Sequence, residues 1–398
     1  MEQLSNRIKA MEESATIAMA QKARELKAQG ADVISLSLGE PDFKTPDHVC
    51  QAAKEAIDTG KYFSYTPVPG YQDLREAIVD KLKRENQLTY TTNQIVVSTG
   101  AKQSIANTFL CLLNPGDEVI VYAPYWVSYA EIIKLAGGVP VLIHGNIENN
   151  FKATAEQLRS AINPKTKAVI FSSPCNPTGA VFNRDEMAAM AEALSDRPDI
   201  IVVADEIYEH INFSGEHVSI AAMPGMMERT VTVNGFSKGF AMTGWRLGYI
   251  AAPLPIAKAC GKIQGQFTSG TNSIAQRAAI AALTGDMTPT QKMAKAYLRR
   301  RDLVLEKLQE VPGIKTYTPT GAFYIFPDVS EYFGKSDGET SVQNASEFCM
   351  YILNKAHVSL VTGEAFGAPN CVRLSYAASD EALVEAIDRI KNTLAALK

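Results

Sequence analysis

The chain has 398 residues, of which 46% are hydrophobic and 21% charged, and its formal net charge is −4. This composition is typical of a globular protein with room for two domains and a large core. The weak acidic balance gives no reason to expect nucleic acid or an anionic membrane as a partner. Six cysteines without a CxxC pair and five histidines without ligand-like spacing argue against a disulfide framework or a metal site, so we expect a reduced, cytoplasmic protein.

The amino-terminal part of the chain predicts a helix but no targeting or membrane segment. The first 26 residues never build the apolar run of a signal peptide. Nowhere do about 18 apolar residues follow one another, as a membrane-spanning helix requires. Residues 14–29 have an amphipathic pattern, and Ser14 is of the type that caps a helix at its N-terminus.

The middle of the chain, from about residue 94 to 251, alternates short β-branched runs with helix-length segments such as Lys102–Leu113 and Arg184–Ser195. Nearly continuous apolar strands separated by helices predict an α/β fold, with a mostly parallel sheet covered by helices on both faces. We expect seven strands in this sheet: Ile95–Val97, Glu118–Tyr122, Val139–Ile143, Lys167–Phe171, Ile200–Ala204, Thr230–Asn234 and Leu247–Ala251.

The carboxyl-terminal part predicts a smaller α+β domain. A helical stretch around Lys292–Glu310 precedes three strand-like runs and a closing helix, at Ala322–Pro327, Val358–Val361, Cys371–Ser375 and Asp380–Ala396. No flexible linker separates the two parts, so we expect them to pack tightly. The predicted division is an arm of residues 1–13, a small domain of residues 14–46 and 298–398, and a large domain of residues 47–297.

Polar residues follow the ends of the central strands, where open α/β sheets bind ligands. Asp205 comes directly after the run IIVVA, and a carboxylate buried there needs a partner. It either caps a following helix or faces a cation such as a protonated pyridine nitrogen, which would make a ring cofactor an electron sink. Tyr208, three residues later, is either a core aromatic or a second contact to that ring.

Lys238 stands among small residues in NGFSKGF, four residues beyond the run TVTVN. It is either a solvated loop lysine or a desolvated amine that forms Schiff bases. Arg246 supplies a nearby cation that can bind phosphate through two parallel hydrogen bonds, and Ser237 adds a hydroxyl. No P-loop and no strand-linked GxGxxG motif offers an alternative phosphate site.

Four segments occur together in the chain: APYWVSY, SPCNPTG, VADEIYEH and VNGFSKGFAMTGWRLGY. Together they resemble the class I and II aminotransferases, which are pyridoxal-phosphate enzymes of fold type I, and more narrowly the bacterial aspartate aminotransferases of the Iβ branch. The resemblance extends from SATIA near residue 14 to CVRLSYA near residue 371. It implies an enzyme that moves amino groups between amino acids and 2-oxo acids by a ping-pong mechanism, with pyridoxal 5′-phosphate as cofactor.

The resemblance implies a role for each matching residue around the cofactor ring. Lys238 would hold the cofactor as a Schiff base and transfer the proton at the substrate Cα. Asp205 would pair with the ring nitrogen, and Tyr208 and Asn176 would bond the ring O3′. Trp126 would stack on the ring, although a core aromatic explains that residue equally well without the resemblance.

The resemblance also implies where the cofactor phosphate lies. The segment TGAKQS follows a predicted strand and opens a helix, a position that suits an anion. The implied phosphate-binding residues of this chain are Gly100, Ala101, Lys102, Ser237 and Arg246. Tyr65 matches a tyrosine that reaches the phosphate of a neighbouring subunit, which implies a homodimer with shared active sites.

Substrate contacts follow from the same resemblance. Arg373 would bind the α-carboxylate through two parallel hydrogen bonds, beside the backbone of Gly39, unless it is paired with an acidic side chain of the protein. Ser14, Thr16 and Lys102 match positions that Iβ enzymes are taken to use for the side-chain carboxylate. A helix cap explains Ser14 fully, and Lys102 could be an exposed first-turn residue whose charge is unfavourable there.

These contacts favour L-aspartate and 2-oxoglutarate as substrates, giving oxaloacetate and L-glutamate. Prephenate is less expected, because Glu12 and Glu13 should repel its second carboxylate. One alternative keeps the cofactor but is an eliminating lyase or an aminotransferase for aromatic or apolar amino acids. Another is a non-catalytic binding module, against which the presence of Lys238 and Asp205 and the lack of a helix-turn-helix region argue.

Overall fold

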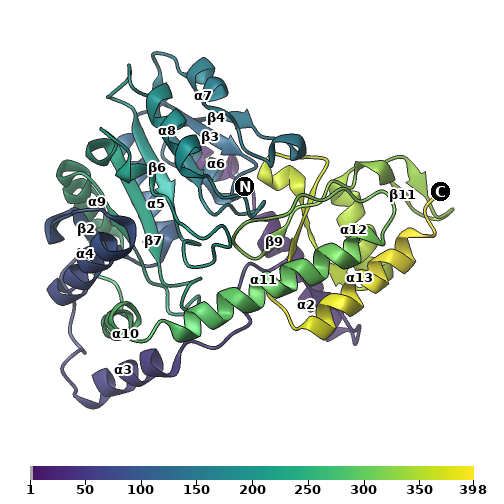
Figure 1. Ribbon diagram of the computed structural model, residues 1–398, viewed down its shortest axis with the longest axis horizontal. Coiled ribbons are helices and arrows are strands. Elements are labelled where there is room, and N and C mark those ends of the chain that lie inside the picture. The colour runs from purple at the N-terminus through teal and green to yellow at the C-terminus, as the bar shows by residue number, and fades with distance from the viewer. Residues whose placement is uncertain (1–2) are drawn as a thin grey trace.

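The computed structural model describes residues 3–398 and shows a large body built around a sheet, beside a smaller body at the other end of the molecule (Figure 1). Within these residues the large sheet has seven strands in the order β2-β8-β7-β6-β5-β3-β4. Neighbouring strands are parallel, except that β8 is antiparallel to both β2 and β7. The strands are β2 Ile95–Ser98, β3 Glu118–Ala123, β4 Val139–His144, β5 Thr166–Ser172, β6 Ile201–Asp205, β7 Thr230–Gly235 and β8 Gly248–Ala251.

The seven predicted strands and the mostly parallel sheet are confirmed, and each strand end lies within one residue of its predicted position. The apolar runs are nearly continuous because both faces of the sheet are covered. In β3, Val119 and Val121 belong to one buried cluster and Ile120 to another. Successive side chains of a strand point to opposite faces, so a sheet buried on both sides needs apolar residues at every position.

Helices cover this sheet on both faces, and the predicted helices Lys102–Leu113 and Arg184–Ser195 are confirmed as α5 and α8. At the start of α8, Asn183 and Glu186 exchange side-chain and backbone hydrogen bonds, which satisfies two backbone N–H groups that the helix leaves free. The helices of the large body are α3 Asp47–Asp58, α4 Gln72–Asn86, α5 Ala101–Leu112, α6 Ser128–Leu135, α7 Ala155–Ala161, α8 Arg184–Ala193, α9 Leu254–Phe267 and α10 Ser273–Thr284. Four 3-10 turns join them, at η1 Thr92–Gln94, η2 Ile147–Asn149, η3 Ile220–Ala222 and η4 Met227–Arg229.

The smaller body combines an early helix and strand with the last third of the chain. Buried apolar side chains of α13, such as Leu383 and Ile387, join one hydrophobic cluster with Phe323 and Phe348, and each such burial contributes roughly 1.5–3 kcal/mol. Its elements are α2 Ala15–Ala28, β1 Ile34–Ser35, α11 Thr288–Gln309, β9 Tyr324–Ile325, η5 Ser330–Tyr332, β10 Lys335–Ser336, β11 Ser341–Val342, α12 Ala345–Ala356, β12 Val358–Ser359, β13 Val361–Thr362, η6 Gly363–Phe366, β14 Val372–Ser375 and α13 Asp380–Leu394.

The predicted strand Val358–Val361 is wrong in one respect, because the structure divides it. Its first part, β12, pairs with β1 in a parallel two-stranded sheet, whereas β13 joins β14 and β9 in an antiparallel sheet. Leu360 lies between the two parts and is buried. A continuous apolar run in the sequence does not reveal that its halves pair with different partners.

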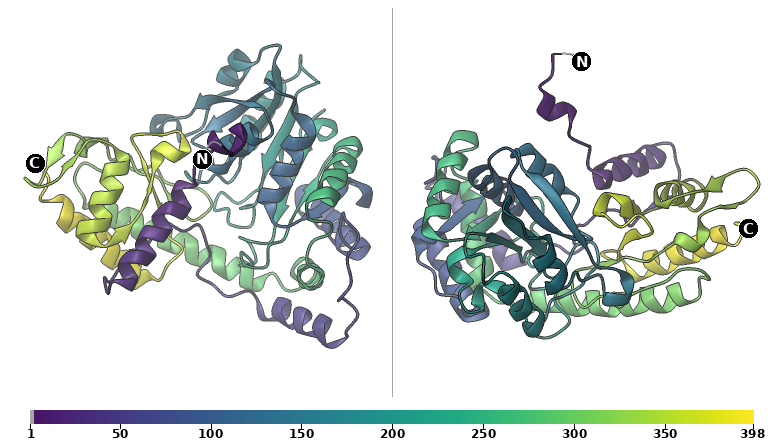
Figure 2. Two further views of the ribbon diagram at one scale, coloured as in Figure 1. Left: turned by 180° about the vertical axis from the view of Figure 1, so that it is seen from behind. Right: turned by 90° about the horizontal axis from the view of Figure 1, so that it is seen from above.

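The predicted domain boundary near residue 297 falls inside α11, which Figure 1 shows running from the large body beside α10 to the small body beside α13. The predicted arm contains the short helix α1 Asn6–Lys9, and Figure 2 shows this segment standing away from the rest of the molecule. Residues 1 and 2 of the arm lie outside the described residues. No helix from residue 3 onward has both the length and the apolar character that crossing a membrane requires.

Candidate active site

A cavity of about 310 Å³ opens at the carboxyl ends of the central strands and is lined by residues of both bodies. It brings together most of the predicted site residues, although they come from distant parts of the chain. Those that line it are Ser14, Thr16, Gly39, Ala101, Lys102, Trp126, Asn176, Asp205, Tyr208, Ser237, Lys238, Arg246 and Arg373. The position agrees with the rule that open α/β sheets bind ligands beyond their strand ends.

Asp205 is the last residue of β6, and only 5% of it is exposed. The Tyr129 hydroxyl donates to its Oδ2 at 2.5 Å, and the backbone N–H of Ile207 donates to its Oδ1 at 3.3 Å. The alternative that Asp205 caps a helix is wrong, because a turn follows β6. Burial raises the pKa of Asp205 to about 6, against the opposing effect of the Tyr129 hydrogen bond. The carboxylate is therefore mostly ionised at pH 7, and no ion pair in residues 3–398 involves it.

Lys238 follows β7 and directs its amine into the same cavity. Its Nζ donates a hydrogen bond to the carbonyl oxygen of Gly39 and lies 5.7 Å from the centre of the Tyr208 ring. Desolvation, and after it the positive charge of Arg373, lowers the pKa of Lys238 to about 8. The alternative of a solvated loop lysine is therefore wrong, since this amine loses its proton far more readily than an exposed lysine.

The amine of Lys238 gives a testable pH dependence in the cofactor-free protein. Only a neutral amine attacks an aldehyde or an acylating reagent. The labelling rate of Lys238 should therefore rise with pH and level off above about pH 8. Competitive acetylation followed by peptide mass spectrometry measures this rate, and a rate that still rises steeply above about pH 9 would contradict the prediction.

The lowered pKa of Lys238 also makes the stability of the folded protein depend on pH. The folded protein binds fewer protons at Lys238 than the unfolded chain does between about pH 8 and the ordinary lysine pKa. The contribution of Lys238 to stability therefore rises as the pH rises through this window.

The predicted phosphate site lies where α5 begins. Gly100 precedes the helix with a φ of +84°, and a Cβ on it would lie 2.3 Å from Nη2 of Arg246, so only glycine fits there. Arg246 donates to the carbonyl oxygen of Thr243 at 2.9 Å and forms no ion pair with any residue from 3 to 398. Ser237 lies beside it in the cavity lining. A helix N-terminus with a free guanidinium and a hydroxyl suits a phosphate group.

Lys102 and Trp126 form one wall of the cavity. The Lys102 Nζ lies 4.9 Å from the centre of the Trp126 ring, and that ring packs edge-on against Tyr129 at 5.5 Å. Desolvation, followed by the charge of Arg246, lowers the pKa of Lys102. The positive charges of Lys102 and Arg246 repel each other, and an anion bound between or beside them would relieve this repulsion.

Arg373 is the largest fully buried side chain of the molecule's described part, with 1% of it exposed. Its Nη1 donates to Oδ1 of Asn176 at 2.9 Å and its Nη2 to the carbonyl oxygen of Ser37 at 2.6 Å. Its Nε has no hydrogen-bond partner, and no acidic side chain in residues 3–398 forms an ion pair with it. The alternative of pairing with an acidic side chain is therefore wrong, and the guanidinium keeps donors free for a carboxylate.

Ser14 and Thr16 reach the cavity from the start of α2. Ser14 is at the N-cap position, as predicted, but its side chain makes no capping hydrogen bond. The hydroxyl oxygen of Thr16 is buried without a hydrogen-bond partner among the described residues. Buried hydroxyls are nearly always hydrogen-bonded in folded proteins. The hydroxyls of Ser14 and Thr16 are therefore available to a ligand in the cavity.

Two predicted site residues, Gly100 and Tyr65, do not line this cavity. Gly100 adjoins the lining residue Ala101, whereas Tyr65 lies on the surface. Its side chain is 98% exposed, on the segment between α3 and α4. Phe63 and Phe267 are also exposed, at 70% and 64%. Large exposed aromatic side chains mark surfaces that bind other molecules.

Two tyrosines that the sequence analysis did not select also line the cavity, Tyr129 and Tyr324. Tyr129 stands within the quoted segment APYWVSY, one helical turn after Trp126, and this spacing was the available signal. Nothing in the sequence indicates Tyr324, because its hydroxyl partner Tyr208 is 116 residues away.

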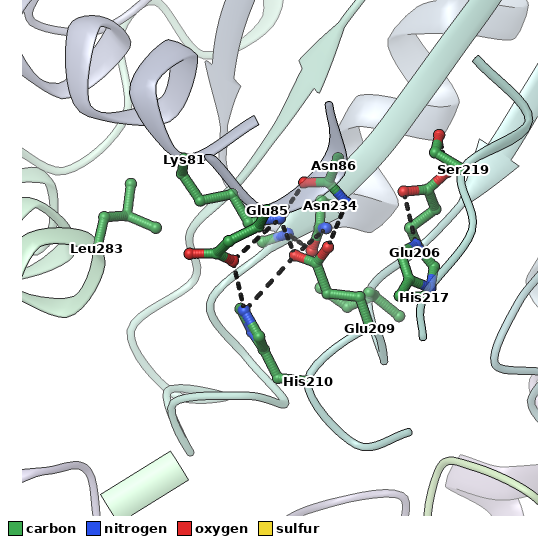
Figure 3. A network of polar contacts seen from close by, with 12 residues as sticks. Lys81, Glu85, Asn86, Glu206, Glu209, His210, His217, Ser219, Asn234 and Leu283 are labelled. Carbon is green, nitrogen blue, oxygen red and sulfur yellow. Dashed lines mark hydrogen bonds and ion pairs between the residues drawn. The ribbon is translucent and has the colours of Figure 1, made fainter. Parts of the chain in front are cut away.

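Behind the cavity, the turn after Asp205 is held by a buried polar network (Figure 3). The Glu209 carboxylate contacts the Lys81 ammonium and accepts hydrogen bonds from Asn86 at 2.9 Å and Asn234 at 2.7 Å. Burial by itself raises the pKa of Glu209, but the charges of Lys81 and of the nearby histidines outweigh burial and hold it well below its usual range. This network fixes the backbone that carries Asp205 and Tyr208.

Glutamates and histidines in this network also come within reach of one another, in the groups Glu85, Glu209, His210 and Glu206, Glu209, His217. The spacing of histidines in the sequence did not predict this proximity. Lys81 contacts Glu209 where a metal ion would need to bind, and Oε2 of Glu206 accepts a hydrogen bond from Nε2 of His217 at 2.9 Å. We propose no metal at these groups, and the absence of a metal site stays a prediction.

Replacing Lys81 by methionine should lower the free energy of unfolding by about 3–5 kcal/mol, because Glu209 would stay buried without its cation. Urea unfolding followed by circular dichroism measures the change. Lys83→Met, on the exposed face of the same helix, is the matched control and should change stability by less than about 0.5 kcal/mol. Equal effects of the two substitutions on the free energy of unfolding would show that the network does not contribute to stability.

The cavity thus combines a buried carboxylate, an amine with a lowered pKa and free guanidinium groups, at the strand ends of an α/β fold. The chain matches the family described as aminotransferase class I and II over residues 31–390, and it belongs to this family. Family members are pyridoxal-phosphate-dependent enzymes that act on amino acids and 2-oxo acids.

Particular relatives narrow the comparison. The chain is 47% identical to an aspartate/prephenate aminotransferase of Cereibacter sphaeroides, with 99% of each chain covered. It is also 47% identical to a bifunctional aspartate aminotransferase and glutamate/aspartate-prephenate aminotransferase of Petunia hybrida, over 99% of this chain and 83% of the relative. The crystal structure of the aspartate aminotransferase from Rhizobium meliloti superimposes with a TM-score of 0.96, at 40% identity and full coverage of both chains.

Proposed function

We propose that the chain transfers the amino group of L-aspartate to 2-oxoglutarate, giving oxaloacetate and L-glutamate, with pyridoxal 5′-phosphate held by Lys238. The observation that carries the proposal is a set of charges that the described chain leaves without ion pairs in one cavity: Lys102, Asp205, Lys238, Arg246 and Arg373. Asp205 and Arg373 of this set are buried, and a buried charge is costly unless it is paired. A ligand with a phosphate, a cationic ring nitrogen and carboxylates complements this set.

The residues present fit the cofactor at each of its polar groups. Asp205 would keep a proton on the ring nitrogen, and Tyr208 with Asn176 would bond the ring oxygen. The start of α5 at Gly100 and Ala101, with Ser237 and Arg246, would hold the phosphate. Trp126 would cover one face of the ring. When bound, pyridoxal phosphate supplies an aldehyde that captures amino groups and a ring that delocalises the electron pair left at the substrate Cα.

The protein residues would then perform the remaining steps. Arg373 binds the α-carboxylate and aligns the Cα–H bond beside Lys238, with Gly39 at the same carboxylate. The neutral amine of Lys238 would act as the base that removes the proton from the substrate Cα and then as the acid that gives the proton back. Ser14, Thr16 and Lys102 bind the second carboxylate of aspartate or 2-oxoglutarate. The same residues would serve both halves of the ping-pong reaction, because aspartate and 2-oxoglutarate occupy the same site one after the other.

We further propose a cytoplasmic homodimer in which Tyr65 of each subunit reaches the active site of the other, because its side chain is 98% exposed and does not line the cavity of its own chain. The exposed Phe63 and Phe267 support a subunit interface in this region. The proposed division of each subunit is an arm of residues 1–13, a small domain of residues 14–46 and 298–398, and a large domain of residues 47–297. Sedimentation analysis of the purified protein tests the dimer.

A panel of amino donors tests the proposed reaction. The purified protein, incubated with pyridoxal phosphate, should absorb visible light, and aspartate or glutamate should convert that band while alanine and phenylalanine do not. Equal conversion by all four would favour an aminotransferase for apolar amino acids, and release of ammonia without a new amino acid would favour a lyase. A protein that stays colourless would contradict the proposal.

Prephenate remains a weaker candidate, although several relatives of the chain are named for it. Glu12 and Glu13 are both exposed just before the cavity residue Ser14. Their negative charges oppose a second carboxylate, at about 1 kcal/mol or less each in water. We expect turnover of prephenate to be slower than that of oxaloacetate, and the ratio of the two kcat/KM values measures the preference.

A further inference from the structure

We propose that Tyr324 is a positioning residue that couples the hydroxyl of Tyr208 to the carboxylate-binding Arg373. The inference rests on the proposed function and adds to it a residue from the small body. Tyr324 lies on β9, is fully buried, and lines the cavity. Its strand pairs with β14, which carries Arg373.

The first contact is between two hydroxyl groups. The Oη atoms of Tyr324 and Tyr208 are 2.7 Å apart, and their rings meet edge-on. A phenol has one proton to donate. If Tyr208 donates its proton to the cofactor oxygen, Tyr324 must be the donor in the bond between the two tyrosines. A hydroxyl that accepts one hydrogen bond donates a stronger one, so Tyr324 strengthens the contact that Tyr208 makes.

The second contact is between the Tyr324 ring and the guanidinium of Arg373. The Arg373 Cζ lies 4.6 Å from the centre of this ring and 5.0 Å from that of Phe366. A desolvated guanidinium gains from an aromatic face at this distance. The ring thus holds the guanidinium plane in place without using the N–H donors that a carboxylate needs.

The third contact is with Gly39. A Cβ on Gly39 would overlap the Tyr324 hydroxyl oxygen, so the backbone there approaches as closely as only glycine allows. The carbonyl oxygen of the same residue accepts the hydrogen bond from Lys238. Tyr324 therefore touches each group that must be aligned for proton transfer: the carboxylate site, the ring-oxygen site and the backbone beside the amine.

The test compares Tyr324→Phe with Tyr324→Leu in the holoprotein, using two readouts besides activity. The first is the pH midpoint of the visible absorbance change, which reports stabilisation of negative charge at the cofactor oxygen. The second is the dissociation constant of maleate, a dicarboxylate with no amino group to transfer. Tyr376→Phe is the matched control, because its buried hydroxyl bonds only a backbone carbonyl, that of Ala322, and does not line the cavity.

Tyr324→Phe should raise the pH midpoint by about 0.5–1 unit, because Tyr208 loses its donor, and should leave maleate binding within about threefold. Tyr324→Leu should raise the midpoint similarly and weaken maleate binding about tenfold, because the ring is lost as well. If Tyr324→Leu does not fold, Tyr324→Met takes its place with the same expectation. Tyr376→Phe should change neither readout.

An unchanged midpoint in Tyr324→Phe would overturn the inference, as would the same shift in Tyr376→Phe. If Tyr324→Leu binds maleate as tightly as the unsubstituted protein does, the proposed coupling of Tyr324 to Arg373 is wrong. These outcomes are distinct from failure of the proposed function. In that case the unsubstituted protein itself would show no visible band and no conversion by aspartate.

Discussion

Replacing Lys238 by alanine should lower kcat with aspartate and 2-oxoglutarate by about 10⁴-fold or more, because in the proposed reaction this residue is both the covalent attachment and the general base. The structure supports both roles, since the amine lies in the cavity, beside the carbonyl of Gly39, and has a pKa lowered to about 8. A coupled assay of oxaloacetate formation under saturating cofactor measures the loss.

The substitution must be shown to act on chemistry rather than on folding. Maleate should still bind to Lys238→Ala loaded with the cofactor, because Arg373 keeps its hydrogen bonds to Asn176 and Ser37. Lys83→Ala, at an exposed position, should retain full activity. Activity of Lys238→Ala within tenfold of the unsubstituted enzyme would exclude Lys238 as the base.

Replacing Asp205 by asparagine should lower kcat by about 10²–10³-fold, because a neutral amide no longer keeps the cofactor nitrogen protonated. The amide is similar in size to the carboxylate, so it tests charge rather than packing. The asparagine should keep the position of Asp205 at the end of β6 and the contact with Tyr129. Single-turnover kinetics with aspartate isolate the proton-transfer step from product release.

A second aspartate provides the control for Asp205. Asp199 precedes the same strand, is exposed, and pairs with Arg197 at 2.8 Å. Asp199→Asn should leave kcat unchanged and reduce stability by less than about 1 kcal/mol, as is usual for an exposed ion pair. A loss in Asp205→Asn no larger than in Asp199→Asn would contradict the role of a buried anion.

Much of the fold could be predicted because local patterns and tertiary structure agree. The β-branched runs form strands at the predicted places since the sheet is buried on both faces. The division between β12 and β13 could not be predicted, because pairing with β1 or β14 depends on residues far away in the chain. Whether a segment forms a strand depends largely on its own residues, whereas the strand with which it pairs depends on residues elsewhere in the chain.

The site shows the same limit. Asp205 stands out in the sequence because a carboxylate directly after an apolar strand is costly to bury without a partner. Lys238 stands out because it follows another such strand by four residues and lies among small residues. Tyr324 and Lys81 do not stand out, since each acquires its significance from a partner on another element: Tyr208 in one case and Glu209 in the other. Arg373 was selected by resemblance, and its burial without an ion pair among residues 3–398 is what the structure adds.

The central claim is that Lys238 binds pyridoxal phosphate covalently in this cavity. Borohydride reduction of the protein with its cofactor, followed by peptide mass spectrometry, tests this claim most directly. We predict that the reduced cofactor is found on the peptide that contains Lys238, in close to one equivalent per chain, and that prior addition of aspartate prevents the labelling. Labelling spread over exposed lysines such as Lys83, or none at Lys238, would contradict the account.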